Sequence, residues 1–299
     1  MLKGVTEDDS ECSSTYQDIL YPIQNAEAGN EQEETFFGDQ IRDFLRIKNP
    51  KNVVISYLKI NSIRNKFENF SSIIEKHVDV LVIAETKLDE TFENRQFHIS
   101  GFKQPYRLDV SSNSGGLLVY INDQIPSRLL SGIDIPCDVQ VLPIELNLKK
   151  TKWLLLPAYR PPSQNEKYFL SHLERMIDFH TKSMQNMLIF GDLNMEVSEP
   201  AMQLLIQQHS LFSMIRSPTC FKSPQGNCID LMLTNSKHSF FGSQTFETGF
   251  SDFHHMVYTI LKTTYTKLPP KIIEYRDYKK LSETDFLTDL SKCSLFDDS

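Results

Sequence analysis

The sequence lacks long hydrophobic runs. Its longest apolar run spans about seven residues, Val78–Ala84, and is interrupted by Asp79, whereas a membrane-spanning helix needs about 20. The first 20 residues are acidic and contain no apolar core, so they do not resemble a secretory signal. We therefore expect an intracellular protein that does not interact with a membrane.

Cysteine is scarce and is not arranged for metal binding. The five cysteines form no CxxC pair and no Cys/His spacing typical of a zinc site, and their number is odd. In a chain of this length, these features predict reduced thiols rather than a disulfide framework. They also exclude a cysteine-based metal centre.

The sequence also has no excess of positive charge. The formal net charge is -8, but residues 1–50 contain 11 acids and 4 bases, whereas residues 51–265 contain 21 of each. The acidity therefore belongs to the N-terminal tail, and the central body is balanced. Bulk charge neither indicates nor excludes a nucleic-acid partner.

The sequence divides into three segments. Residues 1–50 are rich in Glu, Asp, Ser and Gln, and we expect a mostly disordered acidic tail with a short helix near Phe36–Ile47. Residues 51–263 contain the sustained apolar patterns of a folded domain. Residues 264–299 contain KLPPK and a charged stretch, which predict a linker or a truncated C-terminal extension.

Residues 51–263 contain both apolar runs and amphipathic stretches. The runs have the length of buried strands; they are Asn52–Leu58, Val78–Ala84, Gly116–Ile121, Val139–Leu148, Trp153–Tyr159, Met187–Phe190, Ile229–Thr234 and Met256–Leu261. Three stretches predict helices: Asn65–His77, Gln164–Ser183 and Pro200–Gln208. Because helices separate only some of the strands, the order favours an α+β fold or a sandwich over a regular βαβ repeat.

Acidic and polar residues follow several runs, at strand ends where an α/β sandwich gathers catalytic groups. Glu85 follows VDVLVIA, and Asp192 and Asn194 follow NMLIFG. Two residues apart, Asp192 and Asn194 can point to the same side and hold an attacking water beside a phosphate oxygen. The alternatives are a solvated loop carboxylate at Glu85 and an ordinary Asp/Asn turn.

A second group includes histidine. Asp230 lies in the apolar segment CIDLML, where a charge needs a partner. The candidates are His254 and His255, in the loop that also contains Ser251 and Asp252. A carboxylate favours protonated imidazole, which can stabilise a phosphate transition state or protonate a leaving oxygen. The alternative is a structural salt bridge or hydrogen bond.

Three further residues are weaker candidates. Tyr159 and Arg160 close a predicted strand and could supply a hydroxyl and a charge to a phosphate, or form a strand-ending turn with a packed aromatic ring. Thr219 could help a neighbouring loop to contact phosphate. Carboxylates, an amide and a histidine that converge at one edge predict metal-assisted hydrolysis of a phosphate ester.

Seven segments, taken in order, carry a resemblance to a known family. They are INSIRNKFENF (60–70), DVLVIAETKLD (79–89), PYRLDVSSNSGGLLVYI (105–121), AYRPP (158–162), IFGDLN (189–194), CIDLMLTN (228–235) and ETGFSDFHHM (247–256). Over about residues 52–263, the chain resembles the endonuclease/exonuclease/phosphatase superfamily, the fold of pancreatic deoxyribonuclease. Within it, the endonuclease domain of non-LTR retrotransposon proteins is the more similar type.

The resemblance implies an α+β fold, a deoxyribonuclease-like four-layer α/β/β/α sandwich. It implies a metal-dependent endonuclease that hydrolyses DNA phosphodiester bonds, with Mg²⁺ or alternatively Mn²⁺ and no small-molecule cofactor. It also implies a nuclear location. Relatives of this type have a downstream reverse transcriptase domain, which this chain does not contain.

The resemblance implies a role for each candidate residue. The metal ligands would be Glu85 and Asp252. The catalytic residues would be Asp192, which activates water, His254, Asp230, Tyr159 and Asn194. The substrate-binding residues would be Asn61, Arg160, Thr219 and Ser251.

Two positions depart from the family pattern. Lys59 stands where the family usually has Asn, two residues before Asn61, and an ammonium there would repel Mg²⁺ or pair with Glu85. Phe253 separates the Asp and His of the last motif, so His255 competes with His254 as the catalytic imidazole. The Lys59 departure supports a second hypothesis, a catalytically impaired remnant of a mobile element that retains the fold. A third hypothesis, a phosphoinositide, sphingolipid or nucleotide substrate, is disfavoured by the retrotransposon-like motifs.

Overall fold

The computed structural model describes residues 50–74, 77–149, 151–265 and 282–292. The expected disordered tail and the helix near Phe36–Ile47 lie outside these residues. No helix within the described ranges combines the length and the apolar character needed to cross a membrane.

The first sheet has six strands within the described ranges, in the order β12–β13–β1–β2–β4–β3. Their bounds are β1 Asn52–Lys59, β2 Val80–Ala84, β3 Tyr106–Leu108, β4 Leu117–Ile121, β12 Phe240–Phe246 and β13 Met256–Thr264. Strands β1 and β2 are parallel, and the other neighbouring pairs are antiparallel.

The second sheet follows the order β10–β11–β9–β8–β7–β5, and β6 also pairs with β8. The bounds are β5 Ser127–Leu129, β6 Gln140–Val141, β7 Ile144–Leu148, β8 Thr151–Tyr159, β9 Asn186–Asp192, β10 Phe212–Ser213 and β11 Asp230–Thr234. Here β8 and β9 form the parallel pair. Each sheet therefore has one parallel pair among antiparallel neighbours.

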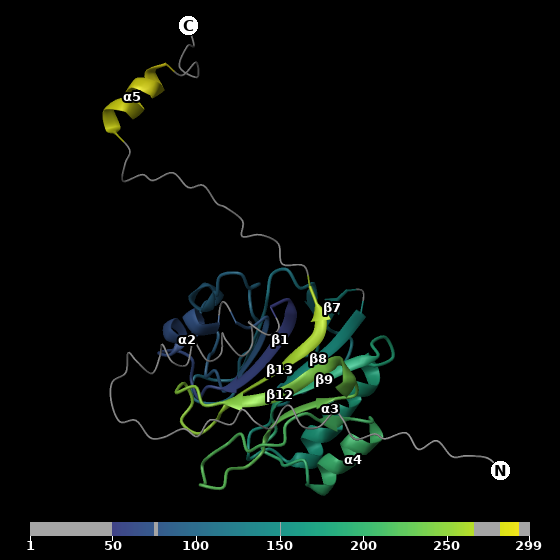
Figure 1. The fold of residues 1–299 in the computed structure, drawn as a ribbon. Helices are drawn as coiled ribbons and strands as arrows, with labels where there is room; N and C mark the ends of the chain where they lie inside the picture. Colours follow the sequence, from purple (N-terminus) through teal and green to yellow (C-terminus); the bar gives the residue numbers. More distant parts are fainter. Residues whose placement is uncertain (1–49, 75–76, 150, 266–281, 293–299) are drawn as a thin grey trace, which may run out of the picture.

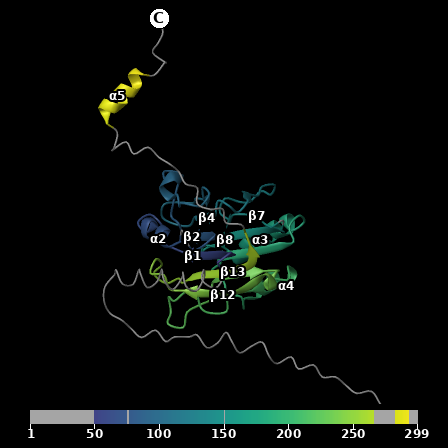
Figure 2. The same cartoon turned by 45° about the horizontal axis from the view of Figure 1, so that its top comes forward.

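Helices cover the outer faces of the two sheets. Figures 1 and 2 show α2 on one side of the paired sheets and α3 and α4 on the other. The α-helices are α2 Phe67–Ile74, α3 Glu166–His180, α4 Pro200–Gln208 and α5 Glu283–Ser291, and the 3-10 helices are η2 Asn94–Phe97 and η3 Lys237–Ser239. Asn165 caps α3, since its side chain accepts a hydrogen bond from the Tyr168 amide.

Three apolar clusters fill the spaces between the layers. Side chains alternate across a strand, so Val54 and Leu58 of β1 pack with Phe70 of α2, whereas Tyr57 packs with Phe190 of the second sheet. A third cluster joins the other face of the second sheet to α3 and α4. Burial on both faces explains why the central strands are continuous apolar runs. The four-layer α/β/β/α sandwich is confirmed.

The two parallel pairs place their carboxyl ends at one edge of the sandwich. Lys59 ends β1, and Glu85 directly follows β2. Tyr159 ends β8 and pairs in register with Asp192 at the end of β9, which in turn lies opposite Asp230 of β11. Residues distant in the sequence therefore meet because their strand ends are neighbours.

Some elements differ from the prediction. The expected strand Val139–Leu148 is divided into β6 and β7, which are separated at Pro143, a residue that has no N–H to donate to a ladder. Strand β12 was missed, because its glycine and polar residues weaken the apolar pattern and its register shifts. Helix α5 forms in the expected linker and buries none of its residues.

Candidate active site

Strained backbone marks the edge where the strand ends meet. Asn61, Glu85 and Asn194 follow β1, β2 and β9, and all three have positive φ, at 52°, 53° and 47°. Non-glycine residues seldom adopt this left-handed conformation, and it persists where surrounding contacts hold it, often at functional sites. The strain therefore supports a functional assignment for this edge.

Gly191 allows strands β8 and β9 to approach closely just before Asp192. A Cβ atom added at this glycine would lie 1.7 Å from the carbonyl oxygen of Ala158. No side chain fits in that space, so the position requires glycine. This contact sets the position of Asp192 beside Tyr159.

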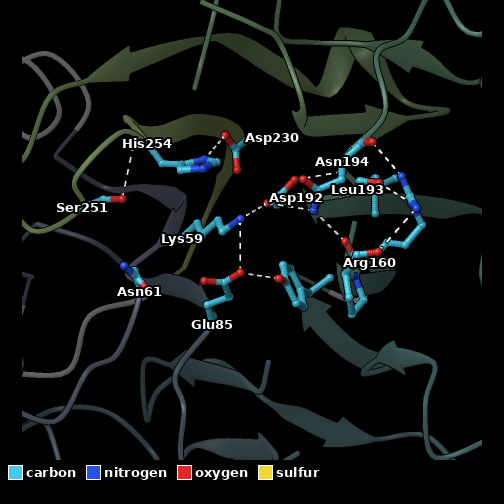
Figure 3. A network of polar contacts seen from close by, with 12 residues as sticks. Lys59, Asn61, Glu85, Arg160, Asp192, Leu193, Asn194, Asp230, Ser251 and His254 are labelled. Carbon is cyan, nitrogen blue, oxygen red and sulfur yellow. Dashed lines mark hydrogen bonds and ion pairs between the residues drawn. The ribbon is translucent and has the colours of Figure 1, made fainter. Parts of the chain in front are cut away.

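Asp192 is fully buried and lies at the centre of the polar network (Figure 3). Its Oδ2 accepts a hydrogen bond from Lys59 Nζ at 2.8 Å, and its Oδ1 accepts one from the Asn194 amide at 2.8 Å. Burial and the neighbouring Asp230 charge raise the pKa of Asp192 to about 6, against the opposing effect of Lys59. A carboxylate with this pKa can accept a proton near neutral pH.

His254 and Asp230 form a buried pair beside Asp192. His254 Nδ1 donates to Asp230 Oδ2 at 2.8 Å, and the Asp230 amide donates to Thr219 Oγ1 at 3.1 Å. Among the described residues, neither His254 Nε2 nor Asp230 Oδ1 has a hydrogen-bond partner. The Nε2 atom is therefore available to a ligand, as an acid or a hydrogen-bond donor requires.

The second candidate histidine is placed differently. His255 stacks on the ring of Phe221, with ring centroids 4.3 Å apart, and its amide donates to the Thr219 carbonyl. Burial lowers the pKa of His255. Of the two histidines, His254 is the one that pairs with Asp230.

Glu85, which follows β2 of the first sheet, lies beside Lys59 (Figure 3). The Tyr159 hydroxyl donates to Glu85 Oε1, and Lys59 Nζ lies 3.3 Å from the same oxygen. Burial alone would raise the pKa of Glu85, but the Tyr159 hydrogen bond and the Lys59 charge hold it below its usual value. Burial likewise opposes the charge of Lys59, but Asp192 and Glu85 hold its pKa above the usual value. Both groups are therefore ionised at neutral pH.

The outer edge of the site is polar. Asn61 donates from Nδ2 to Asp252 Oδ2 at 3.1 Å and accepts from Lys87 Nζ at 2.6 Å. The Ser251 hydroxyl accepts a hydrogen bond from the His254 amide at 3.3 Å. The sequence analysis did not single out Lys87, although it lies only two residues after Glu85.

Arg160 and Thr219 are buried and bond to the protein, and their expected contacts with substrate stay predictions. Arg160 Nε donates to the Leu193 carbonyl at 2.7 Å, and its terminal nitrogens donate to the carbonyls of Asn194 and Gln164 at 2.7 and 2.6 Å. Thr219 is fully buried and accepts from the Asp230 amide. Arg160 therefore holds the segment that directly follows β9, and Thr219 bonds to the first residue of β11.

Asn194 also bonds within the protein. Its Nδ2 donates to the Arg160 carbonyl at 2.7 Å and lies 3.4 Å from Asp192 Oδ2. These contacts orient Asp192, and the expected contact of Asn194 with phosphate stays a prediction.

Tyr57 was missed by the sequence analysis. It is fully buried on β1, two residues before Lys59, and the alternation of a strand places both side chains on the same face. Burial and the charges of Asp230 and Asp192 raise the pKa of Tyr57 well above its usual value. Side chains of a strand alternate between its two faces, so the residue two positions before Lys59 shares its face. This alternation was the sequence signal that could have identified the Tyr57 hydroxyl.

The residue types at the site suit a divalent ion, but an ammonium lies between two of the carboxylates. Asp192, Asp230 and His254 form a group with metal-ligand spacing among the described residues, with one donor atom of each within 4.8 Å of the others. His254 Nδ1 and Asp230 Oδ2 bond to each other, whereas His254 Nε2 and Asp230 Oδ1 have no partner among the described residues. The space between Asp192 and Glu85 is taken by the Lys59 ammonium. The residues therefore do not fit a divalent ion at that place.

Comparisons with known proteins agree with the fold. The profile of the endonuclease/exonuclease/phosphatase family matches residues 41–252. The fold is similar to an AP endonuclease from Archaeoglobus fulgidus, with a TM-score of 0.55 and 16% identity, covering 71% of this chain and 100% of that chain. It is also similar to the endonuclease domain of TRAS1, a telomere-specific non-LTR retrotransposon, with a TM-score of 0.55 and 11% identity, covering 70% and 98%.

A third structure contains nucleic acid. It is the 3′ phosphatase NExo from Neisseria, in a variant form bound to a product DNA hairpin, with a TM-score of 0.54 and 13% identity, covering 70% of this chain and 99% of that chain. At these identities the similarities establish the fold alone. No curated protein matches the chain in sequence.

Proposed function

The chain belongs to the endonuclease/exonuclease/phosphatase family, and from this premise we propose that it is an endonuclease that hydrolyses phosphodiester bonds in DNA. We further propose that the domain derives from a non-LTR retrotransposon. The observation that carries the activity is the buried Asp230–His254 pair, whose Nε2 has no partner among the described residues, beside the proton acceptor Asp192. The similarity in fold to the TRAS1 endonuclease domain supports the proposed origin.

The proposed reaction is a single displacement at phosphorus. Asp192 accepts a proton from water as the water oxygen attacks, and a new P–O bond forms. The bond from phosphorus to the leaving sugar oxygen breaks, and that oxygen takes the Nε2 proton of the His254 imidazolium. Asp230 stabilises this imidazolium through its contact with Nδ1.

Basic side chains beside the site support a polyanionic substrate. Arg64, Lys66 and Lys87 surround the loop that follows β1: Arg64 donates to the Lys87 carbonyl at 2.7 Å and Lys66 to the Ile60 carbonyl at 2.7 Å. Lys87 reaches Asn61 at the edge of the site. Such cations can hold the backbone phosphates on either side of the cleaved bond. The DNA-bound relative from Neisseria favours DNA as the polymer.

One observation favours a second candidate function. Lys59 occupies the space between Glu85 and Asp192, and its bond to Asp192 competes with the water that Asp192 must orient. A domain that keeps the fold and binds nucleic acid without turnover is the alternative. The requirement for Mg²⁺ or Mn²⁺ that the resemblance implies is tested in the same assay.

A supercoiled-plasmid nicking assay in Mg²⁺, in Mn²⁺ and in EDTA tests the proposal. We expect nicking by the wild type, and a loss of about 10²- to 10⁴-fold in Asp192→Ala, His254→Ala and Asp230→Asn, because each removes a group involved in proton transfer. Asp134→Ala and His238→Ala are matched controls, since both residues are exposed and neither is among the residues placed at the site. These two should keep the wild-type rate.

Two outcomes would contradict the proposal. Nicking that persists in Asp192→Ala would remove that residue as proton acceptor. The absence of nicking by folded wild-type protein in all three buffers would favour the domain without turnover, and gel-shift binding of the plasmid would then identify a binding function.

A further inference from the structure

Lys59 is a buried cation between two acids that come from different sheets. It is the last residue of β1 and is 5% exposed. Its Nζ lies 2.8 Å from Asp192 Oδ2 and 3.3 Å from Glu85 Oε1, and 5.5 Å from the centroid of the Tyr159 ring. Lysine usually extends its ammonium to solvent. Here the side chain instead points inward and joins the two sheets (Figure 3).

We propose that the Lys59 ammonium is the resident cation of this site: it takes the place of a divalent ion between Glu85 and Asp192 and is itself a ligand for the phosphate group. The part about phosphate rests on the proposed phosphodiester chemistry. The part about cation exclusion depends only on the geometry of these three side chains.

The charges explain the exclusion. Glu85 and Asp192 are the two carboxylates that would bind a cation at this place, and both already contact one positive charge. A divalent ion would have to displace a tethered ammonium from both carboxylates or lie beside it against direct repulsion. Because Lys59 is covalently part of β1, its ammonium cannot dissociate from the site as a bound metal ion can.

The geometry also leaves a contact for substrate. An ammonium has three N–H donors, and Asp192 and Glu85 accept two of them. The third can donate to a non-bridging oxygen of a phosphate, as a point charge that tolerates a range of angles. The nearby Tyr159 hydroxyl already donates to Glu85, so the donor available to a phosphate oxygen at this place is the Lys59 ammonium.

Direct measurement of Mn²⁺ binding by electron paramagnetic resonance tests the exclusion without relying on activity. We expect the wild type to bind Mn²⁺ no more tightly than about 1 mM, a value typical of weak oxygen-ligand sites. Lys59→Asn should bind one ion tighter by at least about a hundredfold, because it exposes both carboxylates to the ion. Adding Glu85→Gln to Lys59→Asn should abolish the gain. Lys51→Asn, which removes an exposed lysine just before β1, should match the wild type.

Each outcome decides the proposal. The proposal is overturned if the wild type binds one Mn²⁺ in the micromolar range and Glu85→Gln abolishes that binding. It is also overturned if the Lys59→Asn variant binds Mn²⁺ no more tightly than the wild type does. If Lys59→Asn does not fold, as judged by thermal melting, Lys59→Gln keeps most of the side-chain length and serves as the second variant, with the same expectations.

The nicking assay in EDTA separates this proposal from the proposed function. EDTA-resistant nicking that falls in Lys59→Gln supports both. If the wild type binds Mn²⁺ weakly and nicks the plasmid in none of the buffers, the proposal that Lys59 excludes a divalent ion stands and the proposed endonuclease activity is rejected. If nicking requires Mg²⁺ and the wild type binds Mn²⁺ tightly, the proposed endonuclease activity stands and the proposal that Lys59 is the resident cation is rejected.

Discussion

Replacement of Lys59 by methionine should destabilise the fold, because it leaves buried acids without their cation. At an effective dielectric of about 20, the attraction across 2.8 Å is about 6 kcal/mol and across 3.3 Å about 5 kcal/mol, before the cost of removing these charges from water is subtracted. Removal of one partner of a buried pair typically costs about 3–5 kcal/mol. Asp192 is fully buried, so we expect Lys59→Met to lie in that range, with Tm lower by about 10 °C.

Urea unfolding followed by tryptophan fluorescence can measure this loss. The single tryptophan, Trp153, is buried between the sheets and packs edge-on against Phe240, with centroids 5.5 Å apart. Its emission therefore reports separation of the two layers. Lys51→Met is the matched control and should change the free energy of unfolding by less than about 0.5 kcal/mol, since the residue is exposed.

A double-mutant cycle decides the cause of the loss. If the uncompensated charge of Asp192 is responsible, Lys59→Met combined with Asp192→Asn should recover most of the stability lost in Lys59→Met. A loss below about 1 kcal/mol in the single variant, or simple additivity in the double variant, would refute the reasoning.

Two further substitutions test how the site is supported. Gly191→Ala should destabilise the domain by about 4 kcal/mol or more, because its Cβ would overlap the Ala158 carbonyl of the neighbouring strand; a thermal midpoint within about 2 °C of the wild type, taken as about 1 kcal/mol, would contradict this. Arg160→Lys should cost about 2–3 kcal/mol in urea unfolding, since one ammonium cannot replace a guanidinium that donates to four carbonyls. Arg95→Lys is its control, because the Arg95 side chain is 82% exposed, and an equal loss in both variants would count against the argument.

The sequence predicted the main strands because burial leaves a local signal. The continuous apolar runs around Val82 and Phe190 identify strands covered on both faces, and their lengths match the sandwich. Strand β12 carried no such signal, because six of its seven residues are not buried. Edge strands pair through their backbone and need little apolar surface, so patterns of side chains do not reveal them.

The candidate site was predictable in part for a related reason. Asp192 and Glu85 follow apolar runs, and the charge of Asp230 in an apolar segment demanded a partner, so the sequence indicated that these acids matter. The preference for His254 over His255 is supported by the hydrogen bond to Asp230. The sequence did not reveal that the buried side chains of Arg160 and Thr219 bond to backbone atoms, because a sequence pattern does not tell which way a buried polar group points.

The sequence by itself determined which residues end the strands and that Lys59 replaces an amide in the first motif, since chain order and residue type are properties of the sequence. Only the tertiary structure decided that the ammonium lies between Glu85 and Asp192. Those carboxylates belong to different sheets and come together only when the sheets pack, and electrostatic attraction over about 3 Å depends on that packing.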